Sequence, residues 1–383
     1  METPAFITDQ TAIVETMKAV DEIRKVSGVN FLYTLKPNAH PDVMIPMIGH
    51  VDGFAASSVN EARISRAIIG DRGSVHITTP GFRQQDICEL GDLCDYAAMN
   101  SLGQFERFGN VLSEMLSLGI RVNPHLSFVK DDRYNPCRAK SKLGVDIGDL
   151  SRKVEDRWRP LDALQGIHFH TNCESKTFKP LLKTAERISE KLGHLLDGLE
   201  WINMGGGYLF EDEKRRDSLY AAISLFQDKH KLKVYMEPGG GCVRNSGYIV
   251  TSVIDLFESD GQKIAMLDTT VNHMPEVYEY QFEPDVSGYS EKGKHEYLLA
   301  GATCLAGDLL GVYTFDEPLK IGSRLAVLNS GAYTQVKSHM FNGVSLPSVY
   351  SVTLAGDLLL RKKFEFEDYI SQFGEEYDAA IRA

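Results

Sequence analysis

The chain has 383 residues, of which 43% are hydrophobic and 25% are charged, and its formal net charge at pH 7 is −12. This composition is typical of a globular protein, and the length predicts about two domains. The acidic balance excludes a basic surface for nucleic acid or anionic lipid, and no apolar run reaches the roughly 18 residues of a membrane span. Six cysteines without a CxxC pair, and a first segment unlike a signal peptide, predict a cytoplasmic protein with reduced thiols.

The first 245 residues alternate between amphipathic helices and short apolar strands. The apolar spacing predicts a helix over 10–26 and strands over 29–36, 51–56, 74–78, 95–99, 119–123, 165–170, 199–204 and 233–237. Helices are expected between most of them, including 59–69, 102–117, 176–196 and 213–230, whereas 124–164 contains a long polar loop. This alternation predicts a parallel (β/α)8 barrel over 28–244, with a doubly wound sheet as the alternative.

Two glycine runs favour the barrel. Residues 205–207 and 239–241 are both Gly-Gly-Gly, and they follow the seventh and eighth predicted strands. Barrel enzymes commonly bind phosphate in these two loops, because backbone N–H groups can approach an anion closely where side chains are absent. The two runs therefore predict a phosphate site at the carboxyl end of the barrel.

After Asn245 the pattern changes to strands without long helices. Strands are expected over 247–257, 263–269, 296–303, 309–315, 323–329 and 351–359. They predict a C-terminal β domain, barrel-like or sandwich-like, made of residues 245–383 and completed by residues 1–27.

Three side chains at predicted strand ends could carry chemistry. Lys36 ends the first barrel strand and Glu237 ends the eighth, and strand ends of a barrel supply reactive groups. His168 and His170 share one face of the sixth strand because side chains alternate along a strand. They lack a third ligand at suitable spacing, so we expect no metal, and His170 is the better placed to stack on a cofactor. A solvated lysine and hydrogen-bonded structural histidines are the alternatives.

Considered together, these groups predict a cofactor. A carboxylate beside a phosphate loop would repel the phosphate unless it served another charge, such as a protonated ring nitrogen. An amine that can form an imine, a ring that can stack, an anion site and a carboxylate are the groups that bind pyridoxal phosphate.

Nine short blocks, in order along the chain, resemble the fold type III (alanine racemase-like) pyridoxal-phosphate decarboxylases, and most of all the carboxynorspermidine decarboxylases. The resemblance spans nearly the whole chain. The blocks are YTLK (33–36), ASSVNEAR (56–63), YNPC (134–137), HFHTNCE (168–174), WINMGGG (201–207), DT (268–269), HMPEV (273–277), TCLAGD (303–308) and FNG (341–343).

The resemblance implies a role for each matching residue. Lys36 would bond covalently to pyridoxal phosphate, His170 would stack on its ring, and Glu237 would keep the ring nitrogen protonated. The other implied cofactor contacts are Cys173, Gly205, Gly206, Gly207, Gly239, Gly240 and Tyr333. The family consists of head-to-tail homodimers with shared sites, so Cys304 would reach the partner's site and protonate the product carbon. The implied substrate contacts are His273, Glu276 and Asp308.

Three departures from the family pattern leave the substrate open. Residues 237–241 read EPGGG rather than EPGEA, so a second carboxylate is missing. The lysine block continues with Pro37-Asn38, and residues 330–334 read SGAYT, as in ornithine and diaminopimelate decarboxylases. The sequence therefore predicts a decarboxylase of carboxynorspermidine-like or carboxyspermidine-like substrates in polyamine biosynthesis. A paralogue acting on another basic or diamino acid, an amino acid racemase and a non-catalytic regulator are the alternatives.

Overall fold

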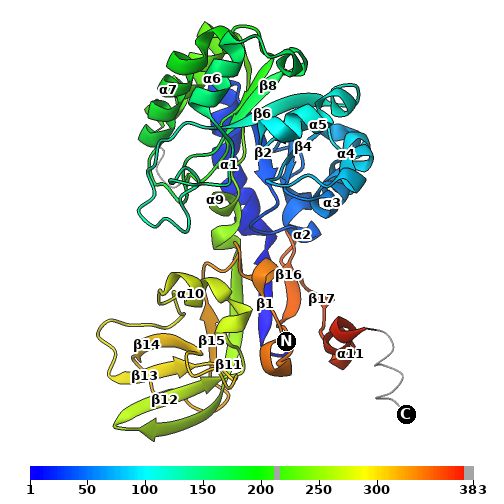
Figure 1. The fold of residues 1–383 in the computed structure, drawn as a ribbon. Coiled ribbons are helices and arrows are strands. Elements are labelled where there is room, and N and C mark those ends of the chain that lie inside the picture. Colours follow the sequence, from blue (N-terminus) through cyan, green and yellow to red (C-terminus); the bar gives the residue numbers. More distant parts are fainter. Residues whose placement is uncertain (211–215, 375–383) are drawn as a thin grey trace. The chain divides into compact units, whose positions relative to one another are not determined.

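The computed structural model describes residues 1–210 and 216–374 (Figure 1). The chain divides into two compact units, Glu15–Cys242 and the combination of Met1–Val14 with Val243–Ala383. Within the described residues, no helix has the length and apolarity that crossing a membrane would require.

The unit Glu15–Cys242 is a closed barrel of eight parallel strands. Their order around the barrel is β5-β4-β3-β2-β10-β9-β8-β6, and pairing of β6 with β5 closes the ring, while the two-residue strand β7 (Val145–Asp146) lies beside β6. The eight predicted strands are thereby confirmed. They are β2 (Asn30–Thr34), β3 (Gly53–Ala56), β4 (Ser74–Thr78), β5 (Tyr96–Met99), β6 (Ser117–Asn123), β8 (Gly166–Phe169), β9 (Trp201–Asn203) and β10 (Lys233–Met236).

Helices connect successive barrel strands (Figure 1). Serine side chains begin two of them: Ser58 Oγ accepts from the N–H of Glu61, and Ser101 Oγ accepts from the N–H of Gln104, which satisfies an otherwise unpaired donor in each first turn. The helices are α1 (Gln10–Ser27), α2 (Pro41–Met44), α3 (Val59–Ile69), α4 (Ile87–Leu93), α5 (Leu102–Leu112), α6 (Ile147–Glu155), α7 (Lys179–Leu196), α8 (Asp217–Ser224) and α9 (Gly240–Val243).

Two predicted helices differ from the observed ones. The helix expected over 102–117 ends at Leu112, because Ser117 already begins β6 and pairs with Tyr96 of β5. The helix expected over 213–230 is α8 followed by a π-helical turn, Leu225–Lys229, and its first residues 213–215 lie outside the described part of the chain.

The other unit is built on a mixed, mostly antiparallel sheet. Its strand order is β14-β13-β12-β11-β1-β16-β17, with β15 paired to β11, and β1 from the start of the chain lies between β11 and β16 (Figure 1). The strands are β1 (Ala5–Asp9), β11 (Gly247–Ser259), β12 (Gln262–Leu267), β13 (His295–Ala300), β14 (Leu309–Phe315), β15 (Arg324–Val327), β16 (Ser348–Val352) and β17 (Leu358–Lys362). The unit also contains the short helices α10 (Pro275–Tyr280) and α11 (Phe366–Ile370).

The strand expected over 351–359 is wrong. The chain turns at Gly356, whose φ of +87° favours glycine, and the N–H of Thr353 donates to the carbonyl of Asp357. Residues 351–359 therefore cover the end of β16, a hairpin turn and the start of β17. Apolar residues on both sides of this turn made it resemble one continuous strand.

Candidate active site

The residues predicted to hold the cofactor gather at the carboxyl ends of the barrel strands. Lys36 follows β2, His170 follows β8 and Glu237 follows β10. Because all eight strands are parallel, these ends open at one mouth of the barrel. The four charged or titratable groups Lys36, His170, Glu237 and Arg121 interact electrostatically there.

Lys36 is surrounded by protein and still reached by solvent. Burial lowers the pKa of Lys36, the positive charge of Arg121 lowers it further, and Glu237 and Glu61 act in the opposite direction. Burial disfavours a charged ammonium group, so a larger share of this amine is neutral than in a surface lysine. A neutral, accessible amine is what a lysine needs in order to act as a nucleophile.

The Glu237 carboxylate is held by two donors. Asn203 Nδ2 donates to Oε1 at 2.7 Å, and the Nε2–H of His168 donates to Oε2 across 3.3 Å. Burial by itself would raise the pKa of Glu237, but His168, His76 and Lys36 outweigh it and hold the pKa at about 2. Within the described residues, no lysine or arginine forms an ion pair with this carboxylate. Glu237 is therefore an ionised acid that an amide and a histidine hold without a direct ion pair to lysine or arginine.

The first glycine run passes so close to its neighbours that side chains are excluded. A Cβ on Gly206 would lie 2.1 Å from the carbonyl oxygen of Glu237, and one on Gly207 would lie 2.2 Å from that of Asn172. Gly207 also has a φ of +88°. In this structure the N–H of Gly205 donates to Asn203 Oδ1 and that of Gly206 donates to His170 Nδ1. The N–H of Gly207 takes part in neither of these two contacts.

His170 is a neutral ring of defined tautomer. Burial, Lys36 and Arg121 hold the pKa of His170 well below its usual value. Its Nδ1 accepts the hydrogen bond from Gly206, so the ring proton sits on Nε2. Neither His168 nor His170 belongs to a metal cluster, and residues 1–210 and 216–374 contain no group of three or more side chains suited to a metal ion.

The remaining predicted cofactor residues of the barrel unit also lie near this mouth. A Cβ on Gly239 would lie 2.5 Å from Thr34 Cγ2, so the second glycine run passes closely over the end of β2. Gly240 begins α9. Cys173 is exposed and interacts electrostatically with Lys36.

The other predicted residues belong to the β-sheet unit. Asp308 is buried, and its Oδ1 accepts from the N–H of Val271 at 2.8 Å, while Oδ2 accepts from Thr270 Oγ1 and the N–H of Thr303. Both oxygens are thus engaged within the unit, which gives Asp308 a structural role as a tie between loops. Its contact with a substrate amine stays a prediction.

Two neighbouring side chains of this unit have buried atoms without partners. Glu276 Oε1 accepts from Thr334 Oγ1, but Oε2 has no hydrogen-bond partner among the described residues, and burial raises the pKa of Glu276. His273 Nδ1 bonds to Thr269 Oγ1 at 3.1 Å, and its Nε2 is also unpaired within that part of the chain. Buried polar atoms are normally hydrogen-bonded, so these two atoms lack a partner that such atoms usually have.

Cys304 and Tyr333 are the last two predicted residues. Cys304 is exposed, and its N–H donates to Asn342 Oδ1 at 3.0 Å, which joins the TCLAGD and FNG blocks. Tyr333 has a φ of +65°, an uncommon conformation for a non-glycine residue that accumulates at functional sites.

Sequence reasoning assigned no role to three residues of the barrel mouth, Arg121, Asn203 and Glu61. Arg121, His168 and Asn203 are register neighbours on β6, β8 and β9, so they form a row across three strands. Glu61 accepts from the N–H of Ser57 at 2.7 Å and interacts with Lys36. Asn203 precedes a glycine run by two residues, and Arg121 is a charge in an apolar strand. Both signals were present in the sequence.

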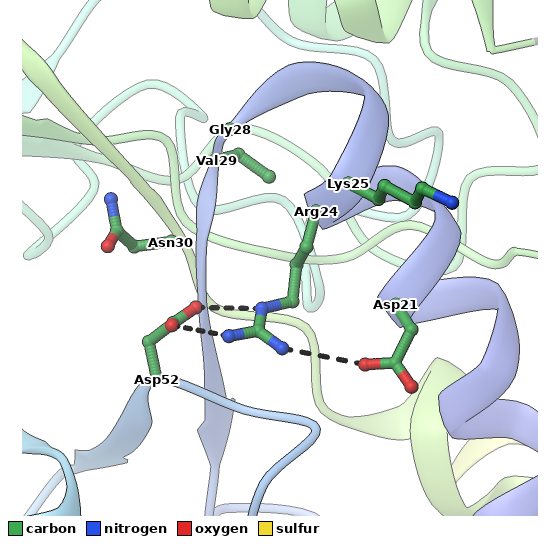
Figure 2. Close-up of a pocket in the computed structure, with 7 residues that line it drawn as sticks. All are labelled: Asp21, Arg24, Lys25, Gly28, Val29, Asn30 and Asp52. Carbon is green, nitrogen blue, oxygen red and sulfur yellow. Dashed lines mark hydrogen bonds and ion pairs between the residues drawn. The ribbon is translucent and has the colours of Figure 1, made fainter.

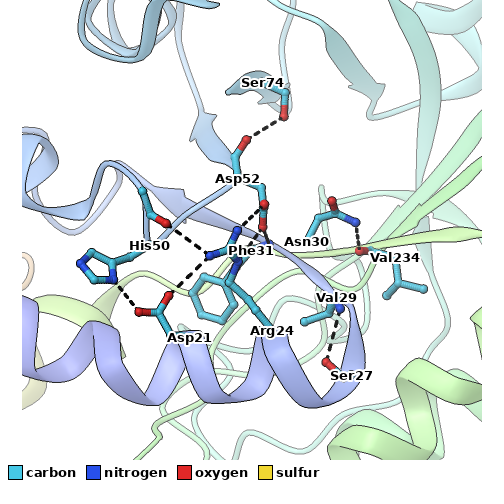
Figure 3. Close-up of polar contacts among 11 residues, drawn as sticks. Asp21, Arg24, Ser27, Val29, Asn30, Phe31, His50, Asp52, Ser74 and Val234 are labelled. Carbon is cyan, nitrogen blue, oxygen red and sulfur yellow. Dashed lines mark hydrogen bonds and ion pairs between the residues drawn. The ribbon is translucent and has the colours of Figure 1, made fainter. Parts of the chain in front are cut away.

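A separate surface pocket of about 370 Å³ lies at the other end of the barrel strands (Figure 2). It is formed where β2 begins and just before β3, and it is lined by Asp21, Arg24, Lys25, Gly28, Val29, Asn30 and Asp52. Three of its charged side chains have partners: Arg24 binds Asp52 through two nitrogens, and Asp21 binds His50 at 2.7 Å (Figure 3). Because barrel enzymes react at the carboxyl ends of their strands, this paired cluster is part of the barrel's support.

Comparison with known proteins finds strong similarity over nearly the whole chain. Residues 7–331 match the family described as pyridoxal-dependent decarboxylase, C-terminal sheet domain. Carboxynorspermidine/carboxyspermidine decarboxylase of Herminiimonas arsenicoxydans is 30% identical, over 97% of this chain and 99% of that protein. Carboxyaminopropylagmatine decarboxylase of Synechocystis sp. is 32% identical, over 98% and 96%. The crystal structure of carboxynorspermidine decarboxylase from Campylobacter jejuni with norspermidine is 28% identical with a TM-score of 0.87, over 97% and 100%.

Proposed function

Because the chain belongs to the pyridoxal-dependent decarboxylases, we propose that it decarboxylates a carboxylated polyamine of the carboxynorspermidine or carboxyspermidine type. We place this reaction in polyamine biosynthesis in the cytoplasm, in agreement with six cysteines that are all free thiols. The observation that carries the proposal is Glu237, an ionised acid with no direct lysine or arginine ion pair among the described residues. It lies in the same barrel mouth as Lys36, whose pKa is lowered by burial.

The residues present fit pyridoxal phosphate. The cofactor combines an aldehyde, a basic ring nitrogen and a phosphate. Lys36 would hold the aldehyde, Glu237 would face the ring nitrogen, and His170 would lie against the ring. Gly207, Gly239 and Gly240 would hold the phosphate, and Gly205, Gly206 and Tyr333 would line the same site. Cys173 would be a further contact of the cofactor.

The chain's own residues divide the chemistry among them. Bound pyridoxal phosphate supplies an electron sink that weakens the bond to a substrate carboxylate. Burial lowers the pKa of the Lys36 amine, which favours the neutral form that attacks a carbonyl. Asn203 and His168 keep the Glu237 carboxylate ionised and oriented, so it can stabilise a proton on an adjacent nitrogen. Cys304 of a second copy would give a proton to the product carbon.

The β-sheet unit supports a cationic substrate. The unpaired Glu276 Oε2 and His273 Nε2 are buried polar atoms that a ligand could satisfy. A buried carboxylate is costly unless a cation answers it, so a distal ammonium group of a polyamine would suit Glu276. The relatives named for carboxynorspermidine, carboxyspermidine and carboxyaminopropylagmatine agree with this substrate class.

An exposed apolar patch around Cys304 supports a homodimer with shared sites. Tyr278, Tyr280 and Phe282, on and after α10, are 37–52% exposed, and Phe341 is 41% exposed. Gly307 lies beside Tyr278, and Asn342 binds the backbone of Cys304, so parts of the patch lie next to the loop that carries the cysteine. Clustered exposed aromatics mark protein interfaces. We infer that a second copy covers them and receives Cys304 at its barrel mouth.

One feature favours a second candidate. Gly240 stands where the EPGEA pattern of carboxynorspermidine decarboxylases has its second glutamate, so one acidic group near the site is missing. A decarboxylase of another diamino acid is therefore the alternative function.

Release of CO₂ across a substrate panel tests the proposal. The panel contains carboxynorspermidine, carboxyspermidine, carboxyaminopropylagmatine, diaminopimelate, ornithine and arginine. We expect a yellow protein that turns over the carboxylated polyamines at least tenfold better than the amino acids, measured as kcat/KM. Lys36→Ala should lose both the visible absorbance band and turnover.

Two results would contradict the proposal at different levels. Preferred turnover of diaminopimelate or ornithine would replace the substrate and keep the chemistry. A wild-type protein that stays colourless when pyridoxal phosphate is added would remove the decarboxylase function.

A further inference from the structure

Asn203 ends β9 inside the barrel, where only 2% of its surface is exposed. Its amide makes two hydrogen bonds in opposite directions. Nδ2 donates to Glu237 Oε1 at 2.7 Å, and Oδ1 accepts from the N–H of Gly205 at 2.9 Å. One buried side chain thus joins the acid after β10 to the glycine run after β9.

The orientation of this amide is fixed by its two neighbours. The Gly205 N–H can only donate, and the ionised Glu237 carboxylate can only accept. A flipped amide would place a donor against a donor and an oxygen against a carboxylate. Only the observed orientation satisfies both contacts.

Two more hydrogen bonds extend the connection. The N–H of Glu237 donates to the carbonyl of Gly205 at 2.8 Å, and the N–H of Gly206 donates to His170 Nδ1 at 3.1 Å. The acid, the glycine run and the histidine ring therefore belong to one network. Asn203 is the member that contacts both the acid and the run through its side chain.

We propose that Asn203 is a positioning residue that couples the conformation of the glycine run to the placement of the Glu237 carboxylate. The inference rests on the proposed function, because the run and the acid would hold opposite ends of one cofactor. Asn203 itself would act only through Gly205 and Glu237.

The proposal explains why an amide is required at this position. An aspartate could accept from Gly205, but its second oxygen would face Glu237 Oε1 at hydrogen-bonding distance. Two carboxylates that close cannot both be ionised without strong repulsion. Once protonated, the aspartate would carry an O–H that donates as Nδ2 does, so it would reproduce the native contacts. Acid should therefore rescue an aspartate variant.

The test measures the dissociation constant of pyridoxal phosphate for Asn203→Asp relative to wild type, by absorbance titration of cofactor-free protein at pH 8 and pH 5.5. We expect binding at least tenfold weaker than wild type at pH 8, and within about threefold of wild type at pH 5.5. The melting temperature of cofactor-free Asn203→Asp should also be closer to that of wild type at pH 5.5 than at pH 8. Asn203→Leu, which cannot titrate, should bind at least tenfold more weakly at both pH values.

Asn100 provides a matched control. It directly follows β5 of the same barrel, donates from Nδ2 to the carbonyl of Lys142 and accepts from the N–H of Gly144, both at 2.8 Å. Asn100→Asp should lower the melting temperature, but its dissociation constant relative to wild type should not change with pH.

The outcomes separate the two proposals. Equal binding by Asn203→Asp and wild type at both pH values, or a loss of the same factor at both, would overturn the role of Asn203. If Asn203→Asp does not fold, a folded Asn203→Leu protein that binds as wild type would overturn it. A wild-type protein that binds no cofactor would overturn the proposed function as well.

Discussion

The buried carboxylate at the barrel mouth is stabilised by hydrogen bonds and by nearby groups that form no direct lysine or arginine ion pair with it. Glu237 receives hydrogen bonds from an amide and a histidine, and no described lysine or arginine neutralises it directly. A carboxylate whose native pKa is about 2 contributes stability above its unfolded pKa, near 4.5, and loses that contribution as the pH falls toward 2. Glu237 is therefore ionised throughout the physiological range.

Asp308 shows the same principle in the other unit, where backbone and hydroxyl groups satisfy a buried carboxylate. In Asp308→Asn the new amide nitrogen must face either the N–H of Val271 or the N–H of Thr303. One buried donor loses its partner, which costs about 1–3 kcal/mol of the free energy of unfolding. Denaturant unfolding of cofactor-free protein should detect this loss.

Asp316, an exposed carboxylate of the same unit, provides the control for that prediction. Asp316→Asn should change the free energy of unfolding by less than about 0.5 kcal/mol. If Asp308→Asn is as stable as wild type but loses turnover of cationic substrates, Asp308 acts on the substrate and its hydrogen bonds within the unit contribute little.

At the scale of elements, the glycine run fixes how closely two strand ends approach. Gly206→Ala would place a Cβ 2.1 Å from the backbone oxygen of Glu237, and backbone cannot yield as a flexible side chain can. We expect a loss of about 1–3 kcal/mol in the free energy of unfolding and at least tenfold weaker binding of pyridoxal phosphate. Thermal unfolding and absorbance titration measure the two effects.

Gly81 is the matched glycine, because a Cβ there meets no atom within 4 Å. Gly81→Ala should leave stability and cofactor affinity near wild type. Normal cofactor affinity in Gly206→Ala would show that the loop can shift without harm, and would separate the glycine run from the cofactor.

At the scale of the whole molecule, the proposed residues fall on two units that would meet across a dimer. Lys36 belongs to the barrel unit and Cys304 to the β-sheet unit. Mixing inactive Lys36→Ala with inactive Cys304→Ala should restore about a quarter of wild-type activity after subunit exchange, because half of the dimers then hold one intact site. A CO₂-release assay measures the recovery.

A mixture of Lys36→Ala with Glu237→Gln controls for this experiment. Both changes lie in the barrel unit, so every site of the mixed dimer keeps one defect and no activity should return. If neither mixture recovers although the subunits exchange, Cys304 does not complete a neighbouring site.

Local patterns in the sequence determined the eight barrel strands and the positions of Lys36, His170 and Glu237. Each strand is a short apolar run bounded by turn residues, and parallel strands bring their carboxyl ends to one mouth whatever the intervening helices are. The glycine runs were visible because repeated glycine is rare unless backbone must approach something closely. These features depend on neighbours along the chain.

Only the tertiary structure decided what faces these residues. Arg121, His168 and Asn203 form a row because β6, β8 and β9 pair in one particular register, and register depends on contacts between residues far apart in the sequence. The apolar pattern predicted one strand across Gly356, but the chain turns there. The division between β16 and β17 depends on hydrogen bonds between the two strands, which apolar content does not reveal. The bonds of Asp308 to three loop residues likewise required the fold. The sequence determined which groups are present, whereas distances between strands determined their partners and charges.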